Sequence, residues 1–152
     1  MKSPQITWFV RKPDDPAYSK FTQADSYYAG SYAQGSDMSI EFVIWNNRCG
    51  AEPCEDLSDF GISVSFLHLE DSSILKYCSF IINNAYAIEP VYDGNTAVIQ
   101  VPSDIVLSGE ANDGTLSYNN NYIYLKLIIS VPDNETIKMN DLKTMCLNIT
   151  KL

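Results

Sequence analysis

The sequence predicts an all-β protein, a two-layer antiparallel β-sandwich of about eight strands with at most one short helix. Three observations lead to this fold class. Most apolar segments alternate apolar and polar residues at period two, as strands with one buried face do. These segments are short and are separated by clusters of turn-forming residues. No stretch between them is long enough for the crossover helix that a parallel sheet requires. A jelly-roll or an immunoglobulin-like strand order agrees equally with this pattern.

The first strand is expected near the N-terminus, where Ile6, Trp8 and Val10 alternate with their neighbours. The proline-flanked stretch Pro13–Pro16 ends it. The next segment, Ala17–Asp37, is aromatic but has no sustained period. We expect it to be an aromatic loop that lies on the domain, or an arm that docks onto another molecule.

Regular alternation returns in the middle of the chain. A strand is expected at Met38–Asn46, followed by an irregular acidic loop. Ile62–Leu69 and Ile74–Asn83 are then expected to form a hairpin, because both alternate and only a short polar turn separates them. A second hairpin is expected between Ala85–Tyr92 and Thr96–Val101, because an Asp-Gly pair favours a tight turn between them.

The last third of the chain holds the most regular strand. Pro102–Leu107 predicts one short helical turn at most. Tyr122–Val131 then alternates almost without fault and is expected to be a long central strand, which Pro132 ends. Its predicted inward residues are Ile123, Leu125, Leu127, Ile129 and Val131, and its outward residues include Tyr122, Tyr124, Lys126 and Ser130. A final strand is expected at Thr144–Lys151.

Length and charge limit the range of functions. We expect a single domain over residues 1–152, since a chain of this size buries roughly two-thirds of its unfolded surface in one core. The formal net charge of −9 disfavours nucleic acid and anionic membranes as partners. The N-terminus shows no apolar signal region, and no apolar run reaches the length of a membrane span. Synthesis in the cytoplasm without a signal peptide is therefore expected.

The four cysteines, Cys49, Cys54, Cys78 and Cys146, allow three interpretations. We favour four reduced thiols, with Cys78 and Cys146 as small apolar residues of strands. The alternatives are a disulfide between Cys49 and Cys54, or a zinc ion bound by all four. Zinc is the weakest of these, because the spacing is loose and the chain has one histidine.

No recognisable catalytic arrangement is present in the sequence. The one histidine, His68, lies at the end of a predicted strand, where a structural role is expected. Neither a nucleophile elbow nor a phosphate-binding glycine loop occurs. The acidic pairs fall in predicted loops, where solvated turns are the simpler explanation, and no calcium-loop pattern is present. We therefore expect no enzymatic activity, no cofactor and no metal site.

The tyrosines are the best candidates for a binding surface. The chain has ten, and tyrosine combines an apolar ring with a polar hydroxyl, which suits a surface that a protein or a sugar covers. The alternative is that the loop rings pack down as anchors of their own segments. Trp8 and Trp45 lie in predicted strands and are expected in the core or on a sheet face. The predicted partner-binding residues are Tyr18, Phe21, Tyr27, Tyr28, Tyr32 and Tyr118.

In general character the whole chain resembles the small accessory structural proteins of tailed-phage virions, such as head decoration, head-fibre or tail adaptor proteins. The resemblance rests on the Ser-, Asn- and Thr-rich loops, the lack of an export signal and the lack of catalytic groups. It involves no specific motif and carries over no functional residue. It implies a non-enzymatic assembly protein that contacts copies of itself or a larger scaffold and is incorporated into a virion. The alternative is a carbohydrate-binding β-sandwich module, in which tyrosine and tryptophan stack on sugars.

Overall fold

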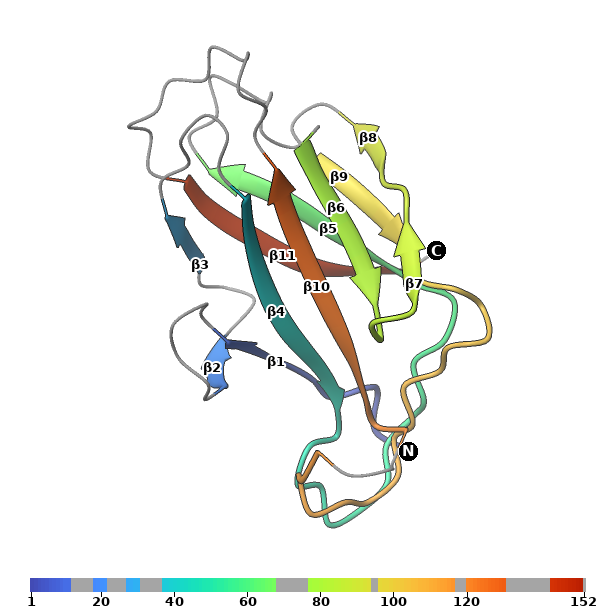
Figure 1. Cartoon of the computed structure of the whole chain (residues 1–152). Coiled ribbons are helices and arrows are strands. Elements are labelled where there is room, and N and C mark those ends of the chain that lie inside the picture. The colour runs from blue at the N-terminus through green and yellow to red at the C-terminus, as the bar shows by residue number, and fades with distance from the viewer. Residues whose placement is uncertain are drawn as a thin grey trace.

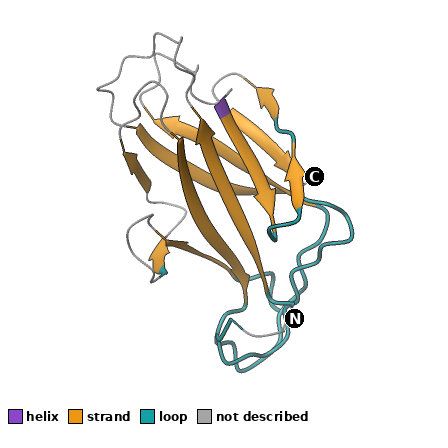
Figure 2. Cartoon of the chain, viewed as in Figure 1, coloured by secondary structure: helices purple, strands orange, loops and turns teal. Residues whose placement is uncertain are grey.

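The computed structural model describes residues 1–11, 18–21, 27–30, 37–67, 77–93, 96–116, 120–130 and 143–151. Within these residues the chain forms two antiparallel sheets that face each other, so the predicted β-sandwich is confirmed (Figures 1 and 2). The described part contains no helical element, and Tyr77 alone has 3₁₀ geometry. None of the described residues forms a helix with the length and hydrophobicity that crossing a membrane requires.

One sheet has six strands and the other has five. The six-stranded sheet has the spatial order β2 (Ser19–Phe21), β1 (Ile6–Arg11), β4 (Asp37–Asn46), β10 (Tyr122–Ser130), β6 (Cys78–Ile82) and β7 (Tyr86–Ile88). The five-stranded sheet has the order β3 (Tyr27–Gly30), β11 (Lys143–Lys151), β5 (Phe60–Leu67), β9 (Thr96–Gln100) and β8 (Val91–Asp93).

The predicted central strand is confirmed as β10. It pairs with β4 along its whole length and with β6 on its other side. Every second residue of β10 is buried, and the residues between them are half-buried, as period two predicts. The strand ends at Ser130, two residues before Pro132, which cannot donate a backbone hydrogen bond to a neighbouring strand.

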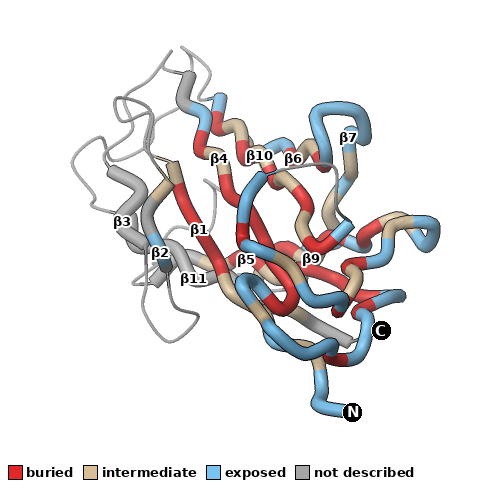
Figure 3. The backbone as a smooth tube through the Cα atoms, turned by 90° about the horizontal axis from the view of Figure 1, so that it is seen from below, coloured by how far each residue is buried: buried red, intermediate tan, exposed pale blue. Residues whose placement is uncertain are grey.

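The core lies between the two sheets. Figure 3 shows buried stretches along the long strands and exposed residues in the loops. Phe42, Phe80 and Leu125 enter the core from one sheet, and Phe60 and Ile99 enter it from the other; all are at most 1% exposed. Burial of each such side chain contributes roughly 1.5–3 kcal/mol relative to its exposed state. Packing of alternate residues from both layers therefore stabilises the sandwich.

The described residues form eleven strands where about eight are expected, because four of them are very short. Segment 17–37 contributes β2 to one sheet and β3 to the other. The stretch predicted as one strand at Ala85–Tyr92 is also divided, into β7 and β8, which lie in different sheets. Each lateral edge of the sandwich is thus formed by one segment that gives an edge strand to both layers (Figure 1).

One predicted hairpin is wrong and the other is confirmed in part. Strands β5 and β6, expected to pair, lie in opposite sheets: β5 pairs with β11 and β9, and β6 pairs with β10 and β7. Alternation shows that each segment has an apolar face. The two faces contact the core from opposite sides, one from each sheet, so the segments are not neighbours in one sheet. The second hairpin exists between β8 and β9, where Asp93 opposes Thr96.

Two tight turns are found where the sequence predicts the end of one strand and a short helical turn. Asn83 and Asn84 both have positive φ, of 52° and 54°, and the Ala85 N–H donates to the Ile82 carbonyl, which joins β6 to β7. At Pro102, where a helical turn is expected, the carbonyl accepts one hydrogen bond from the Ile105 N–H and no helix follows.

Of the two expected topologies, the strand order resembles the immunoglobulin-like one in part. The run β1-β4-β10-β6 has the chain order and neighbours of strands A-B-E-D of an immunoglobulin-type sandwich, and β11-β5 corresponds to F-C. Strands β3, β9 and β8 extend the second sheet in a different order. The shared part places β4 and β10 side by side at the centre, and this pair carries the surface described next.

Candidate functional site

The outer face of the six-stranded sheet carries three ordered rows of side chains. Alternate residues of β1, β4 and β10 point away from the core, and the strand register aligns them in rows. We call these nine residues the outer grid. Its rows are Thr7–Trp45–Tyr122, then Phe9–Val43–Tyr124, then Arg11–Glu41–Lys126. Two rows are therefore rich in aromatic residues and the third is charged.

The rings of the outer grid pack against one another. The ring centroids of Phe9 and Trp45 are 6.0 Å apart, and those of Trp45 and Tyr122 are 4.9 Å apart. Tyr122 and Tyr124 meet edge to face at 5.5 Å. Phe9, Trp45 and Val43 form a second, small buried cluster outside the main core. Edge-to-face and tilted contacts of this kind add about 0.5–1.5 kcal/mol per pair beyond area burial.

Both arginines of the chain lie on this face. The guanidinium of Arg48, in the loop after β4, lies 4.5 Å from the ring centroid of Phe9 and 5.1 Å from that of Trp45. Arg11 forms an ion pair with Glu41 and lies 5.5 Å from the ring centroid of Tyr18. Arginine stacked on aromatic rings is common at binding surfaces, because the planar guanidinium contacts the rings and keeps its hydrogen-bond donors available for a partner.

Tyr18 is the one predicted partner-binding residue whose side chain the structure describes. It is partly buried and packs against the cluster of Phe9, Val43 and Trp45. Burial raises the pKa of its hydroxyl, Arg11 opposes this shift, and a hydrogen bond with Glu41 adds to it. Tyr18 therefore belongs to the margin of the outer grid.

The other five predicted partner-binding residues are not placed on this face by the structure. Phe21 lies in β2, and Tyr27 and Tyr28 lie in β3, but their side chains are outside the described part of the chain. Tyr32 and Tyr118 lie outside the described residues altogether, as does His68.

Sequence reasoning missed the main members of the grid as candidates for binding. Tyr122 and Tyr124 were assignable to the outward face of the central strand by period two, and Trp45 is expected in the core or on a sheet face, as the structure confirms. The available signal was the pattern Tyr-x-Tyr-x-Lys on an outward strand face. Arg48 had no such signal, because it lies in an irregular loop.

A hollow of about 290 Å³ borders the charged row, and we call it the Tyr124 hollow. It combines two tyrosine rings with charged and amide groups. Its lining residues are Arg11, Tyr18, Glu41, Asn84, Tyr124, Leu125 and Lys126. This mixed lining differs from the mostly apolar pockets that enclose small ligands.

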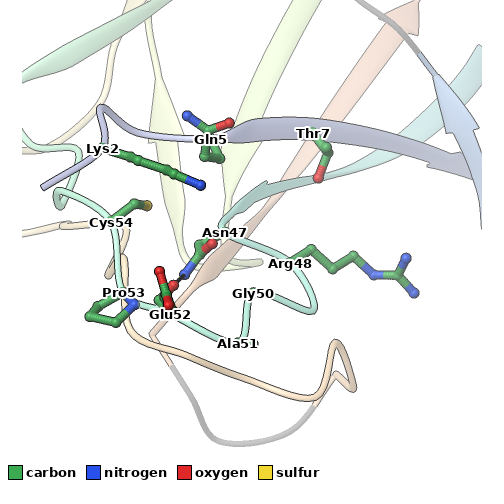
Figure 4. Close-up of a pocket in the computed structure, with 10 residues that line it drawn as sticks. All are labelled: Lys2, Gln5, Thr7, Asn47, Arg48, Gly50, Ala51, Glu52, Pro53 and Cys54. Atoms are coloured by element: carbon green, nitrogen blue, oxygen red, sulfur yellow. Dashed lines mark hydrogen bonds between the residues drawn. The ribbon is translucent and has the colours of Figure 1, made fainter.

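A second hollow, of about 490 Å³, borders the first row, and we call it the Lys2 hollow (Figure 4). The side chains of Lys2 and Glu52 point into it from opposite sides, while Arg48 extends away toward the outer grid. Thr7 joins the hollow to the grid, since it belongs to both. Within the described residues, Thr7 Oγ1 and the neighbouring Trp45 Nε1 are buried and have no hydrogen-bond partner.

Buried asparagines fix the loops that form the Lys2 hollow. The Asn46 amide donates to the carbonyls of Glu55 and Leu107, and its Oδ1 accepts the Gln5 N–H at 2.8 Å. The Asn47 amide donates to the carbonyls of Glu52 and Gly109. Asn121 and Asn112 make similar contacts to the same loops. The loops after β4 and β9 are thereby held together, next to the N-terminal residues.

The thiols do not meet in the described part of the chain. Cys49 is exposed, whereas Cys54 and Cys78 are buried, and all three are free. The Cys54 thiol donates to Asn46 Oδ1 at 3.3 Å, and burial raises the pKa of Cys78 to about 12. The disulfide weighed for Cys49 and Cys54 is therefore not formed in this structure, and the side chain of Cys146 lies outside the described part. Among the described side chains, no three His, Cys, Asp or Glu residues gather in a way that would hold a metal ion.

Compared with known proteins, the chain matches no family model, no curated protein and no solved structure.

Proposed function

We propose that the chain is a non-enzymatic assembly protein that makes protein–protein contacts through the outer grid. The observation that carries this proposal is the aromatic cluster on the outer face of β1, β4 and β10. Phe9 and Trp45 are its buried base, half-buried Tyr122 and Tyr124 pack against it, and the exposed Arg48 guanidinium lies over Phe9 and Trp45. Tyrosine, tryptophan and arginine are the residue types that dominate the energetics of protein interfaces. The larger complex that the sequence resemblance implies is a virion, in which many copies of a small protein contact one another.

The groups on this face are suited to binding. Rings, an ion pair and two arginines offer apolar area together with fixed hydrogen-bond donors. The central strands that carry the grid are the best-paired strands of the described sheet, so the surface is rigid before it binds. A rigid surface loses little side-chain and loop entropy on association, which favours affinity.

The test is the mass of the protein in solution over a range of concentrations. We expect the wild-type chain to associate, and the double variant Tyr122→Ser/Tyr124→Ser to associate much more weakly while remaining folded. The matched control is Tyr86→Ser/Tyr92→Ser, which removes two exposed tyrosines at the opposite edge of the sandwich. A wild-type chain that stays monomeric, or a control that weakens association as much as the grid variant, would contradict the proposal.

Point variants are preferable to deletion of segment 17–37. That segment supplies β2 to β1 and β3 to β11, so its removal would leave both of these longer strands with an unpaired edge. Loss of association after such a deletion would not separate a binding defect from a folding defect. The grid tyrosines are half-buried and outward-facing, so their replacement leaves the main core intact.

A second candidate function is carbohydrate binding, and the Tyr124 hollow favours it. Two tyrosine rings, Tyr18 and Tyr124, lie beside the polar groups of Arg11, Glu41 and Asn84. Rings that stack and planar groups that hydrogen-bond are the chemistry that a sugar requires. A monomer that is retained on a polysaccharide column, and loses this retention in Tyr124→Ala, would establish this function in place of assembly.

A further inference from the structure

We infer that the outer grid binds the acidic loops of a second copy of this chain, so that copies associate head to tail. This inference rests on the proposed function and names the partner of the same surface. Three features of the described residues support it: the cations on the grid, the acids on the loops after β4 and β9, and the rigid attachment of those loops.

The outer grid and its margin are cationic in an otherwise acidic protein. Arg11, Arg48 and Lys126 belong to this face, and Lys20, opposite Phe9 in the register, points the same way. Glu41 is the one acid of the grid. The nine grid residues together with Lys20 and Arg48 therefore include four of the ten Lys and Arg residues and one of the nineteen Asp and Glu residues. Six cations and eighteen acids are left for the rest of the sequence.

The loops at 47–59 and 101–116 carry the opposite charge. They contain one cation, Arg48, which extends toward the grid. Backbone hydrogen bonds between Cys54 and Gly109, and in both directions between Leu57 and Leu107, hold the two loops side by side. Their exposed acids are Glu52, Glu55, Asp56, Asp59, Asp104, Glu110 and Asp113.

The charge distribution favours one mode of association over another. Contact between two outer grids would place cations against cations, and contact between two sets of loops would place carboxylates together; both arrangements cost free energy. Contact between the grid of one copy and the loops of the next joins opposite charges. Such a contact uses different surfaces on the two copies and leads to a ring or an open chain. Because the asparagine amides hold the loop backbone in place, association does not have to order the backbone that carries these carboxylates.

The test uses two charge-reversed proteins. The first is Lys20→Glu/Arg48→Glu, and the second is Glu52→Lys/Glu55→Lys. Each is expected to associate at least about tenfold more weakly than wild type, because like charges then meet at the contact. An equimolar mixture of the two is expected to recover association, since each reversed surface then finds an opposite one. Circular dichroism and thermal unfolding confirm that both variants are folded.

The matched control is Lys143→Glu/Lys151→Glu, which makes the same charge change in β11 of the other sheet. It is expected to associate as wild type does. Raising the salt from about 0.1 M to about 1 M shortens the screening length from roughly 10 Å to roughly 3 Å and is expected to weaken wild-type association about tenfold.

The possible outcomes separate this inference from the proposed function. If wild type associates, loses association in Tyr122→Ser/Tyr124→Ser, and yet responds neither to salt nor to charge reversal, the grid is an interface and the acidic partner is wrong. If wild type does not associate at any concentration, the proposed function itself fails. If the two reversed proteins remain apart when mixed, the head-to-tail contact is overturned.

Discussion

Asn46 lies at the end of β4 and is completely buried. Its side chain binds the backbone of three segments: the N-terminal residues, the loop after β4 and the loop after β9. Local sequence marks Asn46 as the last residue of a strand but not as a link to Leu107, which is 61 positions away. Partners of a buried polar side chain are set by the assembled fold, so this level of detail is the hardest to predict from sequence.

We expect Asn46→Ala to lower the free energy of unfolding by about 3 kcal/mol. The change removes the hydrogen bonds of the Asn46 side chain to the Gln5 N–H and to the carbonyls of Glu55 and Leu107. The Leu107 carbonyl still accepts the Leu57 N–H, but the Gln5 N–H loses its partner. Urea unfolding, compared with the exposed control Asn120→Ala, measures the effect. The control is expected to change stability by less than about 0.5 kcal/mol. Equal effects of the two changes would show that water replaces the buried amide.

Cys78 makes stability depend on alkaline pH. Burial raises the pKa of its thiol from 9.0 to about 12 in the folded chain. Below pH 9.0 the Cys78 thiol is protonated in both the folded and the unfolded chain, and its contribution to the free energy of unfolding is complete. Above pH 9.0 the thiol ionises first in the unfolded chain, so stability falls as the pH rises toward about 12.

We therefore expect the stability advantage of wild type over Cys78→Ala to shrink by roughly 1 kcal/mol per pH unit in this interval. Urea midpoints measured at several pH values test this expectation. Peptide-level labelling with iodoacetamide gives an independent readout, since exposed Cys49 reacts in the folded protein and buried Cys78 is protected. A pH-independent difference between the two proteins would contradict the assigned shift.

At the scale of elements, the turn between β6 and β7 illustrates a local rule that the sequence contains. Two consecutive residues with positive φ, Asn83 and Asn84, are typical of a type I′ hairpin turn. Asn83 also accepts the Tyr124 N–H through its side chain, so it is tied to β10. The Asn84 side chain makes no such hydrogen bond to a neighbouring strand among the described residues, so its replacement tests the backbone conformation of the turn alone.

Asn84→Gly is expected to raise stability by about 0.5 kcal/mol, and Asn84→Ala is expected to lower it by about 1 kcal/mol. Glycine adopts positive φ without the steric cost that a Cβ imposes, while alanine lacks the side chain that lets asparagine tolerate it. Thermal unfolding of the two variants beside wild type gives the ranking. An alanine variant as stable as wild type would mean that the turn changes type.

The long strands could be predicted from the sequence and the short ones could not. Tyr122–Ser130 was recognisable because nine residues give period two enough repeats to stand out. Strands β2, β7 and β8 have three residues each, too few for any period to show. Alternation also states which face of a strand is apolar but not which strand lies beside it, which is why β5 and β6 were wrongly paired.

The candidate site was predictable only in its parts. The outward positions of Tyr122 and Tyr124 follow from period two, but their alignment with Trp45 and Val43 depends on the register of β10 against β4. A shift of one residue would send the same rings into the core. The sequence directed attention to tyrosines in irregular segments, of which Tyr18 alone has a described side chain, and that side chain joins the margin of the grid.

At the scale of the whole molecule, stability is expected to decrease from the centre of the six-stranded sheet to its edges. Strands β4 and β10 each pair with a neighbouring strand on both sides, whereas β2 and β7 each pair on one side among the described residues. Backbone amides of β4 and β10 should therefore exchange hydrogen most slowly, and those of β2, β7 and β8 fastest. Hydrogen–deuterium exchange by mass spectrometry tests this order. Protection of β2 equal to that of β10 would indicate that another molecule covers the edge.

The pairing of β10 with β4 has a consequence for biosynthesis. Asp37 lies opposite Ser130, so the middle of the sheet joins residues that the ribosome produces far apart in time. Until β10 has been synthesised, the edge of β4 that pairs with it has no partner. The long loop that must close to bring β4 and β10 together also slows folding. A nascent chain interrupted before Tyr122 would therefore be a target for chaperones, and full-length protein should acquire its compact state in one late step.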